Sequence, residues 1–468
     1  GDRILIADGL IELRVLEVTS IDIVCEVVNG GELSNRKGVN VPGVTVRLPF
    51  LSDNDKKDLI FGIKNDFDYV ALSFVRSAED VKVVKKFMEE NGGLNIKLIS
   101  KIENRDGVRN IDEIIRVSDG VMVARGDMGV EIPFEEIPHL QKMIIKKTVS
   151  AGKPVITATQ MLDSMIRNPR PTRAEITDVA NAIYDGTSAL MLSGETSIGK
   201  YAELTVATMA KIAEKTETEI DYVKLFDNTH INISKNVTDA ISYSTCSAAH
   251  SLNAAAIITI TKSGHTSRMV SRYRPKCPII ASTPLRKVYN QLALSWGVIP
   301  MLAEEATTTD EIFQNAVDNA LAAGLIKNGD LVVITGGMPV GISGTTNMIK
   351  IHIVGDILVS GISLNGLSAT GVLCVIASSK SSPEDFKGGD ILVIEKSSEQ
   401  ILHLIKNASA VITEEGADSP TAIVARALDI PVIVEAAKAT EILTSGIAVR
   451  IDGEKGLVYS GQSKSGLK

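Results

Sequence analysis

The sequence has few of the residues that build disulfide scaffolds or zinc clusters. Its four cysteines, Cys25, Cys246, Cys277 and Cys374, lie far apart and form no C-x-x-C pair. This argues against both kinds of site and favours a reducing, cytoplasmic location. The six histidines begin only at His139 and form no H-E-x-x-H motif, so a histidine-ligated metal is not expected. Any metal is predicted to be a hard cation bound by carboxylates.

Long apolar runs and an excess of basic charge are also missing. The longest apolar segments, such as 254–260, are far shorter than the ~20 residues that cross a bilayer, so we expect no membrane span. Basic residues number 49 against 57 acidic ones, a net charge of −8, so no nucleic-acid partner is expected. The chain starts at Gly1 without a signal-peptide pattern, and we expect it to begin inside a longer gene product.

The composition is that of a globular protein, with 44% hydrophobic and 23% charged residues over 468 positions. This length suggests about three domains. Residues 1–50 alternate apolar and polar positions between glycine turns, which predicts short antiparallel strands at 4–6, 13–18, 23–28 and 44–48. The Ser-Asp-Asn-Asp string that begins at Ser52 predicts the cap of a helix over 56–64.

Five similar segments follow, each with a short apolar run, a polar cluster and an amphipathic helical stretch. Their spacing of roughly 25 to 35 residues is typical of βα units. Continuous apolar runs predict strands buried on both faces of a parallel sheet, hence a β/α barrel or an open doubly wound sheet. Because a barrel needs eight strands, five leave this choice open. The predicted strands lie within 68–76, 96–104, 120–127, 153–160 and 188–195.

Two further α/β units are predicted after a polar connection at 214–236. Strand-like runs alternate with helical segments in the first unit, and 351–361 is expected to be its last strand and to lead into the second. The predicted strands of the first unit are 254–261, 277–283 and 330–337, and those of the second are 372–378, 390–396, 409–416 and 430–435.

Polar pairs end four consecutive strands of the βα units. Alternate strand residues share a face, and the carboxyl ends of parallel strands form the active face of such folds. A single pair would more simply mark the end of a strand, but four in succession favour one convergent site. The pairs are Lys101 with Glu103, Arg125 with Asp127, Thr157 with Thr159, and Ser193 with Glu195.

Glu103 and Asp127 are the predicted ligands of a divalent cation. Mg²⁺ takes one or two protein carboxylates and leaves its other positions to water and substrate oxygens. Lys101 provides a point charge for a phosphoryl group. An ordinary Lys–Glu ion pair is the alternative, but Lys101 directly follows a buried apolar run, where an unpaired charge is costly. Gly126 and Gly129 flank Asp127 and let backbone N–H groups approach an anion.

Other polar positions leave more than one interpretation open. Thr159 and Ser193 offer hydroxyls for hydrogen bonding or proton relay, or they simply cap strand ends. Thr172 and Glu175 fit a capping box, and we favour that structural role. Lys37 either reaches over the site from the β unit or is a solvated loop lysine.

A strand, a small polar loop and a helix start also follow one another in the second α/β unit. This order suits a phosphate site, although it is not a Walker motif and a plain turn with a helix cap is equally compatible. The residues concerned are Thr261, Lys262, Ser263, Gly264, His265 and Thr266.

Several longer strings carry a family resemblance. With SKIEN, MVARGDMGVEIP, ITATQMLDSM, NPRPTRAE and LMLSGET in this order, the chain resembles the pyruvate kinases from Gly1 to about Gly361. The resemblance implies a TIM-type β/α barrel with an inserted β lid, of which the last five strands and part of the lid are present. It also implies an α/β effector domain and an extra C-terminal module. The implied boundaries are 1–45, 46–215, 216–355 and 356–468.

The resemblance implies transfer of the phosphoryl group of phosphoenolpyruvate to ADP in glycolysis, giving pyruvate and ATP. By matching position, Lys101 would stabilise the transferring group, and Glu103 with Asp127 would hold Mg²⁺ or Mn²⁺. The backbone of Gly126 and Asp127, with Thr159, would bind the substrate carboxylate.

The resemblance also assigns the remaining site residues. Ser193 and Glu195 would belong to a water-linked proton path, and Lys37 would lie near the nucleotide. The six-residue loop that starts at Thr261 would hold the phosphate of a sugar-phosphate or nucleotide effector.

Some family features have no match in this sequence. The ligands for K⁺, which the family uses, belong to an N-terminal stretch without a counterpart here, so these 468 residues alone are expected to be inactive. A homotetramer is expected from the resemblance only.

The last hundred residues resemble a phosphohistidine module found in bacterial members. Pro420 stands where that module carries histidine, so a structural or regulatory role is predicted for it. Two alternatives remain at this stage: a metal-dependent lyase or aldolase that acts on pyruvate enolate, and a catalytically silent effector-binding protein.

Overall fold

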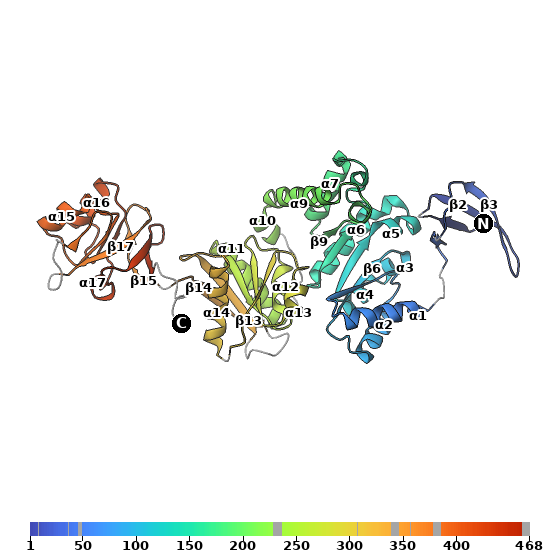
Figure 1. Cartoon of the computed structure of the whole chain (residues 1–468), viewed down its shortest axis with the longest axis horizontal. Helices are drawn as coiled ribbons and strands as arrows, with labels where there is room; N and C mark the ends of the chain where they lie inside the picture. Colours follow the sequence, from blue (N-terminus) through green and yellow to red (C-terminus); the bar gives the residue numbers. More distant parts are fainter. Residues whose placement is uncertain are drawn as a thin grey trace. The chain divides into compact units, whose positions relative to one another are not determined.

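The computed structural model describes residues 1–7, 9–35, 37–44, 49–227, 236–306, 308–337, 346–355, 357–377 and 385–460. Contacts divide the chain into two compact units, Gly1–Ala316 with Val333–Lys350, and Val317–Val332 with Ile351–Lys468. Figure 1 labels the elements of both. Within the described residues, no helix is long and apolar enough to cross a membrane.

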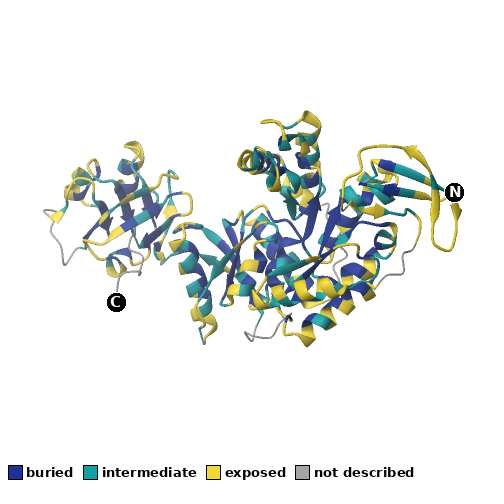
Figure 2. Ribbon diagram, turned by 45° about the vertical axis from the view of Figure 1, so that its right-hand side comes forward, coloured by how far each residue is buried: buried dark blue, intermediate teal, exposed yellow. Residues whose placement is uncertain are grey.

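The N-terminal strands form the predicted antiparallel sheet, in the order β3-β2-β1-β4. Strands predicted at 4–6, 13–18 and 23–28 are confirmed, whereas the one at 44–48 lies outside the described residues except for its first position. Much of the β2–β3 hairpin is exposed (Figure 2). The strands are β1 (Arg3–Ile6), β2 (Ile11–Val18), β3 (Ile23–Asn29) and β4 (Val39–Asn40).

All five predicted βα strands are present in one parallel sheet, paired in sequence order. They are β5 (Tyr69–Leu72), β6 (Lys97–Ile102), β7 (Gly120–Ala124), β8 (Val155–Ala158) and β9 (Ala189–Met191). The helices of this part are α1 (Asp53–Lys64), α2 (Ala78–Glu90), α3 (Arg105–Arg109), α4 (Ile111–Val117), α5 (Arg125–Glu131), η1 (Phe134–Glu136), α6 (Ile137–Ser150), η2 (Asp163–Ile166), α7 (Arg173–Tyr184), α8 (Gly194–Ser197) and α9 (Ala202–Thr218).

Local sequence explains where two of these helices begin. The hydroxyl of Ser52 accepts a hydrogen bond from the Asp55 backbone N–H (3.2 Å), and the Asp55 carboxylate accepts one from the Ser52 N–H (2.9 Å). This capping box satisfies two N–H groups that the helix leaves unpaired, and α1 starts three residues earlier than predicted. Thr172 and Glu175 form the same arrangement at α7, which confirms the predicted structural role.

The parallel sheet β5–β9 is covered by apolar side chains on both faces, in two separate clusters. Helices α2, α4 and α6 contribute Val84, Ile114 and Ile144 to a core that also holds strand residues such as Leu98 and Val121. Figure 1 shows α2 and α4 beside β6. The alternate strand positions, including Ile99 and Met122, form a separate smaller cluster. Burial on both faces is what the continuous apolar runs predicted.

The next part is an α/β fold with sheet order β12-β11-β10-β13-β14. The three predicted strands correspond to β10, β11 and β13. Strand β12 was not predicted because it is a partly buried edge strand and contains Pro300. The elements are α10 (Tyr222–Asp227), α11 (Val237–Ser251), β10 (Ala256–Ile260), α12 (His265–Ser271), β11 (Ile279–Thr283), α13 (Arg286–Leu292), β12 (Val298–Leu302), α14 (Thr309–Ala322), β13 (Leu331–Gly337) and β14 (Thr346–Ile353).

The C-terminal module has an eight-stranded mixed sheet, ordered β15-β22-β21-β17-β18-β19-β20-β16. The four predicted strands are confirmed. The single strand expected over 351–361 is wrong, because the chain turns at Gly355 (φ +95°) between β14 and β15. The elements are β15 (Ile357–Ser360), β16 (Ile362–Ser363), β17 (Ala369–Ile376), β18 (Ile391–Ile394), α15 (Glu399–Ile405), β19 (Ala410–Thr413), α16 (Pro420–Ala427), β20 (Val432–Val434), α17 (Ala439–Ile442), β21 (Ala448–Asp452) and β22 (Leu457–Ser460).

Candidate active site

Lys101 and Glu103 meet at the carboxyl end of β6. The Lys101 Nζ lies 2.6 Å from Glu103 Oε1 and donates to the hydroxyl of Ser73 (2.9 Å). The other carboxylate oxygen accepts a hydrogen bond from the Phe74 backbone N–H (2.6 Å). The Glu103 side chain is fully buried and that of Lys101 is 22% exposed, so the ammonium remains accessible while the carboxylate is held firmly.

Sequence reasoning did not name Ser73 or Phe74. Ser73 directly follows β5, just as the other polar site residues follow their strands. This position could have identified Ser73 from the sequence. Phe74 gave none, because it contributes only a backbone N–H and adopts a left-handed conformation (φ +54°) that a bulky residue rarely takes.

The carboxylates of this region suit a divalent cation. Glu103 Oε1 is buried and accepts no hydrogen bond, since its contact with Lys101 is an ion contact without hydrogen-bond geometry. Asp127 is half-buried in the first turn of α5 and forms no hydrogen bond or ion pair with the described residues. In the described part of the chain, no group of three or more His, Cys, Asp or Glu side chains is placed so that it could hold a metal ion. A cation here would therefore depend on substrate and water for most of its ligands, as Mg²⁺ does.

The second polar pair does not share a strand face, which corrects the prediction. Strand β7 ends at Ala124, and Arg125 and Asp127 lie in the first turn of α5. Residues two apart on a helix point in nearly opposite directions, about 200° apart around the axis. Strand alternation therefore cannot bring these two side chains together.

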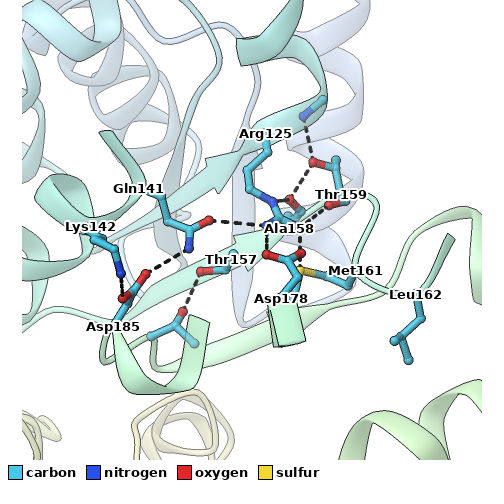
Figure 3. Close-up of polar contacts among 12 residues, drawn as sticks. Arg125, Gln141, Lys142, Thr157, Ala158, Thr159, Met161, Leu162, Asp178 and Asp185 are labelled. Atoms are coloured by element: carbon cyan, nitrogen blue, oxygen red, sulfur yellow. Dashed lines mark hydrogen bonds and ion pairs between the residues drawn. The ribbon is translucent and has the colours of Figure 1, made fainter. Parts of the chain in front are cut away.

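Arg125 instead organises the loop after β8 (Figure 3). Its guanidinium donates to the carbonyl oxygens of Ala158 (3.2 Å) and Thr159 (2.7 Å) and forms an ion pair with Asp178 (2.7 Å). The sequence named Arg125 only as the neighbour of Asp127. Asp178 lies on α7, 53 residues further along, and no local pattern connects the two.

Thr159 lies against α5 as the predicted grouping requires. It adopts a left-handed conformation (φ +70°), and its hydroxyl accepts a hydrogen bond from the Gly126 N–H (2.7 Å) and contacts the Ala158 carbonyl (2.5 Å). The Gly126 N–H, predicted to bind substrate, is thus already paired within the protein. Thr157 is not in the site: it is fully buried within β8, and its hydroxyl donates to that of Thr187 (2.9 Å). Thr159 does not share its strand face, because the backbone turns after Ala158.

Ser193 and Glu195 also leave strand geometry, since Ser193 precedes α8 and Glu195 lies within it. The buried Glu195 carboxylate accepts hydrogen bonds from the backbone N–H groups of Ser193 (2.8 Å) and Leu162 (3.1 Å). The Ser193 hydroxyl is buried and has no hydrogen-bond partner among the described residues. This leaves it available to a water or a ligand.

Lys37 lies in an exposed loop between β3 and β4. It forms no hydrogen bond or ion pair with the described residues, so no contact connects it to the other predicted residues.

Residues 261–264 form a compact turn before α12, and the last two residues of the predicted loop, His265 and Thr266, belong to that helix. The Thr261 hydroxyl accepts from the Gly264 N–H (2.9 Å), and Gly264 is left-handed (φ +77°). Lys262 lies 3.6 Å from Glu305, and both side chains are largely exposed.

The residues from Ser263 to Thr266 are buried or half-buried. The Thr266 and Thr346 hydroxyls are 2.8 Å apart, and the Ser263 carbonyl accepts from Arg268 (3.1 Å). Burial lowers the pKa of His265, which favours the neutral ring.

Pro420 is the first residue of α16, after the capping residue Ser419, whose hydroxyl accepts from the Ala422 N–H (3.3 Å). Next to it, the hydroxyls of Thr421 and Ser397 are 2.8 Å apart. This terminus therefore carries no imidazole in the position that the resemblance assigns to a phosphorylated histidine.

Comparison with known proteins gives matches along the chain. Residues 1–206 match the family described as "Pyruvate kinase, barrel domain", residues 239–352 "Pyruvate kinase, alpha/beta domain", and residues 386–456 "PEP-utilising enzyme, mobile domain". The chain is 48% identical over 466 residues to a pyruvate kinase of Geobacillus stearothermophilus, covering 99% of this chain and 79% of the relative. It is 46% identical over 466 residues to one of Bacillus licheniformis (99% and 80% covered). Identity to one of Clostridium acetobutylicum is 55% over 354 residues (76% and 75% covered).

Proposed function

The chain belongs to the pyruvate kinase family, and on that premise we propose how its residues carry out the family's reaction, transfer of a phosphoryl group from phosphoenolpyruvate to ADP. The observation that carries the proposal is the Lys101–Glu103 contact, in which a buried carboxylate oxygen without a hydrogen bond lies beside an accessible ammonium. Such a pair suits a phosphate ester bound together with a metal ion.

Glu103 and Asp127 would hold the divalent cation, Mg²⁺ or Mn²⁺. When bound, the cation would supply positive charge that offsets the negative charge on the transferring group. The buried environment of Glu103 keeps its carboxylate in one orientation, through the Phe74 N–H and Lys101. K⁺ is an expectation from the family, and we assign it no residues.

Lys101 would neutralise charge on the phosphoryl group as it moves from the enolate oxygen to ADP. Phosphoryl transfer needs little covalent help from the protein, so positioning and charge account for most of the catalysis. Ser73 and Glu103 hold the ammonium at the carboxyl end of β6, which orients it before substrate arrives.

The substrate carboxylate would bind at Gly126, Asp127 and Thr159. Because the Gly126 N–H now donates to Thr159 Oγ1, we propose that a carboxylate oxygen replaces that hydroxyl as acceptor. The hydroxyl, which now donates to the Ala158 carbonyl, can then rotate and donate to the substrate instead.

Ser193 and Glu195 would deliver the proton that converts the enolate into pyruvate. Two backbone N–H groups fix the Glu195 carboxylate, and the buried Ser193 hydroxyl is free to bond a water. Protonation at carbon traps the keto acid, which makes the overall reaction favourable.

The remaining expectations stay proposals. Lys37 would lie near the nucleotide, and the loop 261–266 would bind the phosphate of a sugar-phosphate or nucleotide effector. We also propose a cytoplasmic homotetramer in which the C-terminal module is structural or regulatory. The similarity of the chain to named pyruvate kinases gives no support to the two alternatives, a lyase or aldolase and a catalytically silent binding protein.

Pyruvate formation from phosphoenolpyruvate and ADP tests the proposal, with protein expressed from the complete gene. Lys101→Met should abolish turnover and leave the circular dichroism spectrum and thermal midpoint unchanged. Lys86→Met, at a lysine that is 78% exposed, is the matched control and should retain full activity. Normal turnover in Lys101→Met would refute the role of Lys101, and absence of ATP formation from phosphoenolpyruvate and ADP in the wild-type protein would refute the kinase reaction.

A further inference from the structure

A second, cation-rich pocket lies at the amino end of the βα strands. Pro154 and Ser188, which directly precede β8 and β9, contribute to its wall. Lys101 and Thr159 lie at the opposite, carboxyl ends of their strands, so this pocket is separate from the candidate active site. Four cations line it, Lys153, Arg268, Arg272 and Arg274, and no carboxylate does among the described residues.

Arg274 is buried, with only 8% of its surface exposed. One terminal nitrogen donates to the Gly186 carbonyl (2.6 Å), and the guanidinium stacks on Trp296, 4.7 Å from the ring centroid. Its Nε and Nη1 atoms are buried and have no hydrogen-bond partner among the described residues. Burial lowers the pKa of Arg274, which expresses the cost of keeping this charge away from water.

Two neighbours add to the set of unused donors. Arg272 is 7% exposed and forms an ion pair with Asp239 (3.0 Å), but its Nε has no partner in the described part of the chain. The same holds for the buried hydroxyl of Ser295. Native proteins rarely leave buried polar groups unpaired, because each such group loses the hydrogen bonds that it would form with water. Several such donors around one pocket indicate that they bind something from solution.

Lys153 is held by neutral groups. Its ammonium donates to three carbonyl oxygens, those of Ile115 (2.5 Å), Arg116 (3.0 Å) and Ser118 (2.6 Å). Burial lowers the pKa of Lys153 to about 8, so its charge is costly where it lies.

The acidic residues near the pocket balance its charges incompletely. Asp119 attracts Lys153 and Arg268, but it forms its ion pair with Lys97 (3.2 Å). Glu217 interacts electrostatically with Arg274 but does not line the pocket. The field in the pocket therefore favours an anion.

We propose that this pocket binds a phosphate-type oxyanion, held by Arg274, the Nε of Arg272 and the Ser295 hydroxyl. Guanidinium groups and hydroxyls donate well to tetrahedral oxyanions, which accept several hydrogen bonds at once. Either free phosphate or the phosphoryl group of a larger metabolite would supply such an oxyanion.

Such an anion would join two parts of the first compact unit. Ser188 belongs to the βα sheet region, whereas Arg272 and Arg274 follow α12 in the next α/β fold. The anion would therefore stabilise the packing of the α/β fold on the amino ends of β8 and β9. Arg268, which lines the pocket, also donates to the Ser263 carbonyl. An anion bound in the pocket would therefore be separated from the loop 261–266 by one residue, Arg268.

Isothermal titration with inorganic phosphate tests the proposal without any activity measurement. Because phosphate would also bind at Lys101 and at Lys262, the titration uses a Lys101→Met, Lys262→Ala background of the full chain. We expect one site per chain in that background, and Arg274→Gln should weaken its Kd about tenfold or more, as loss of a charge-assisted hydrogen bond implies. Arg109→Gln, at an arginine that is 72% exposed, should change Kd less than about twofold.

Ser295→Ala provides a second variant if Arg274→Gln does not fold, since it removes one donor without removing charge. It should weaken phosphate binding measurably. A larger enthalpy and tighter Kd for glycerol phosphate than for inorganic phosphate would identify a metabolite phosphoryl group as the ligand, and the reverse would identify free phosphate. Absence of binding at millimolar phosphate in the background, equal affinity for chloride, or unchanged Kd in both pocket variants would overturn the proposal and leave the donors to ordered water.

Discussion

Replacing Arg125 with methionine should disable the candidate active site from outside it. The guanidinium donates to the carbonyl oxygens of Ala158 and Thr159 and pairs with Asp178. Thr159 and Gln160 are both left-handed, with φ of +70° and +54°. Each such residue costs on the order of 1 kcal/mol, so the loop keeps this conformation only while other contacts hold it.

The magnitude follows from these contacts. Charge-assisted hydrogen bonds contribute about 1.5–3 kcal/mol each, but Asp178 is 34% exposed and regains water when its partner is lost. We therefore expect a destabilisation of about 2–3 kcal/mol for Arg125→Met, not the sum of three bonds. Relaxation of Thr159 would displace its hydroxyl and the Gly126 N–H, and misplacement of about 1 Å typically costs about 10²-fold in rate.

The assay combines initial-rate kinetics with urea unfolding, followed by midpoints because a multidomain chain need not unfold in two states. Arg125→Lys keeps the positive charge but loses the planar, multiply donating guanidinium. Its kcat/KM should therefore lie between those of Arg125→Met and the wild-type protein. A double-mutant cycle with Asp178→Asn should show a coupling energy above about 0.5 kcal/mol. Arg109→Met is the exposed control.

The reasoning would be refuted by Arg125→Met with kcat/KM and an unfolding midpoint equal to those of Arg109→Met. Lost stability with unchanged kcat/KM would show that Arg125 supports the fold but does not position Thr159.

Three further predictions concern the metal, pH and local folding. Glu103→Gln should raise the Mg²⁺ concentration for half-maximal activity at least about tenfold, whereas Glu113→Gln on the exposed face of α4 should not; equal Mg²⁺ titrations would contradict the assignment. His250 stacks on Phe226 (5.0 Å), lacks hydrogen bonds to either ring nitrogen within the described residues, and has a pKa lowered by burial. The unfolded chain therefore binds more protons below about pH 6.5, so the unfolding midpoint should fall as pH drops from 7 to 5, and His250→Phe should flatten that slope. Ser52→Ala should lower stability by about 1 kcal/mol through loss of the capping box, measured as a shift of the urea midpoint. Ser20→Ala, at an exposed serine outside any helix, is the control, and equal midpoints for the two variants would show that the cap contributes nothing.

Much of the architecture could be predicted from the sequence because its causes are local. The five βα strands needed only continuous apolar runs with regular spacing, and the starts of α1 and α7 needed only a capping residue and a carboxylate three positions later. The Lys101–Glu103 contact was also predictable, since both residues belong to or directly follow one strand. Family membership depends on short strings and required no coordinates.

Only the tertiary structure decided how the other site residues are held. Alternation along a strand failed for Arg125, Thr157 and Ser193, because the chain leaves extended geometry directly after β7, β8 and β9. The pairing of Arg125 with Asp178 and the unpaired donors of Arg274 both depend on residues far apart in sequence. The periodicity of apolar residues indicates which face of a helix or strand is buried. It does not indicate which distant residue packs against that face. In these two sites the distant residues determine the charge balance and the hydrogen bonding.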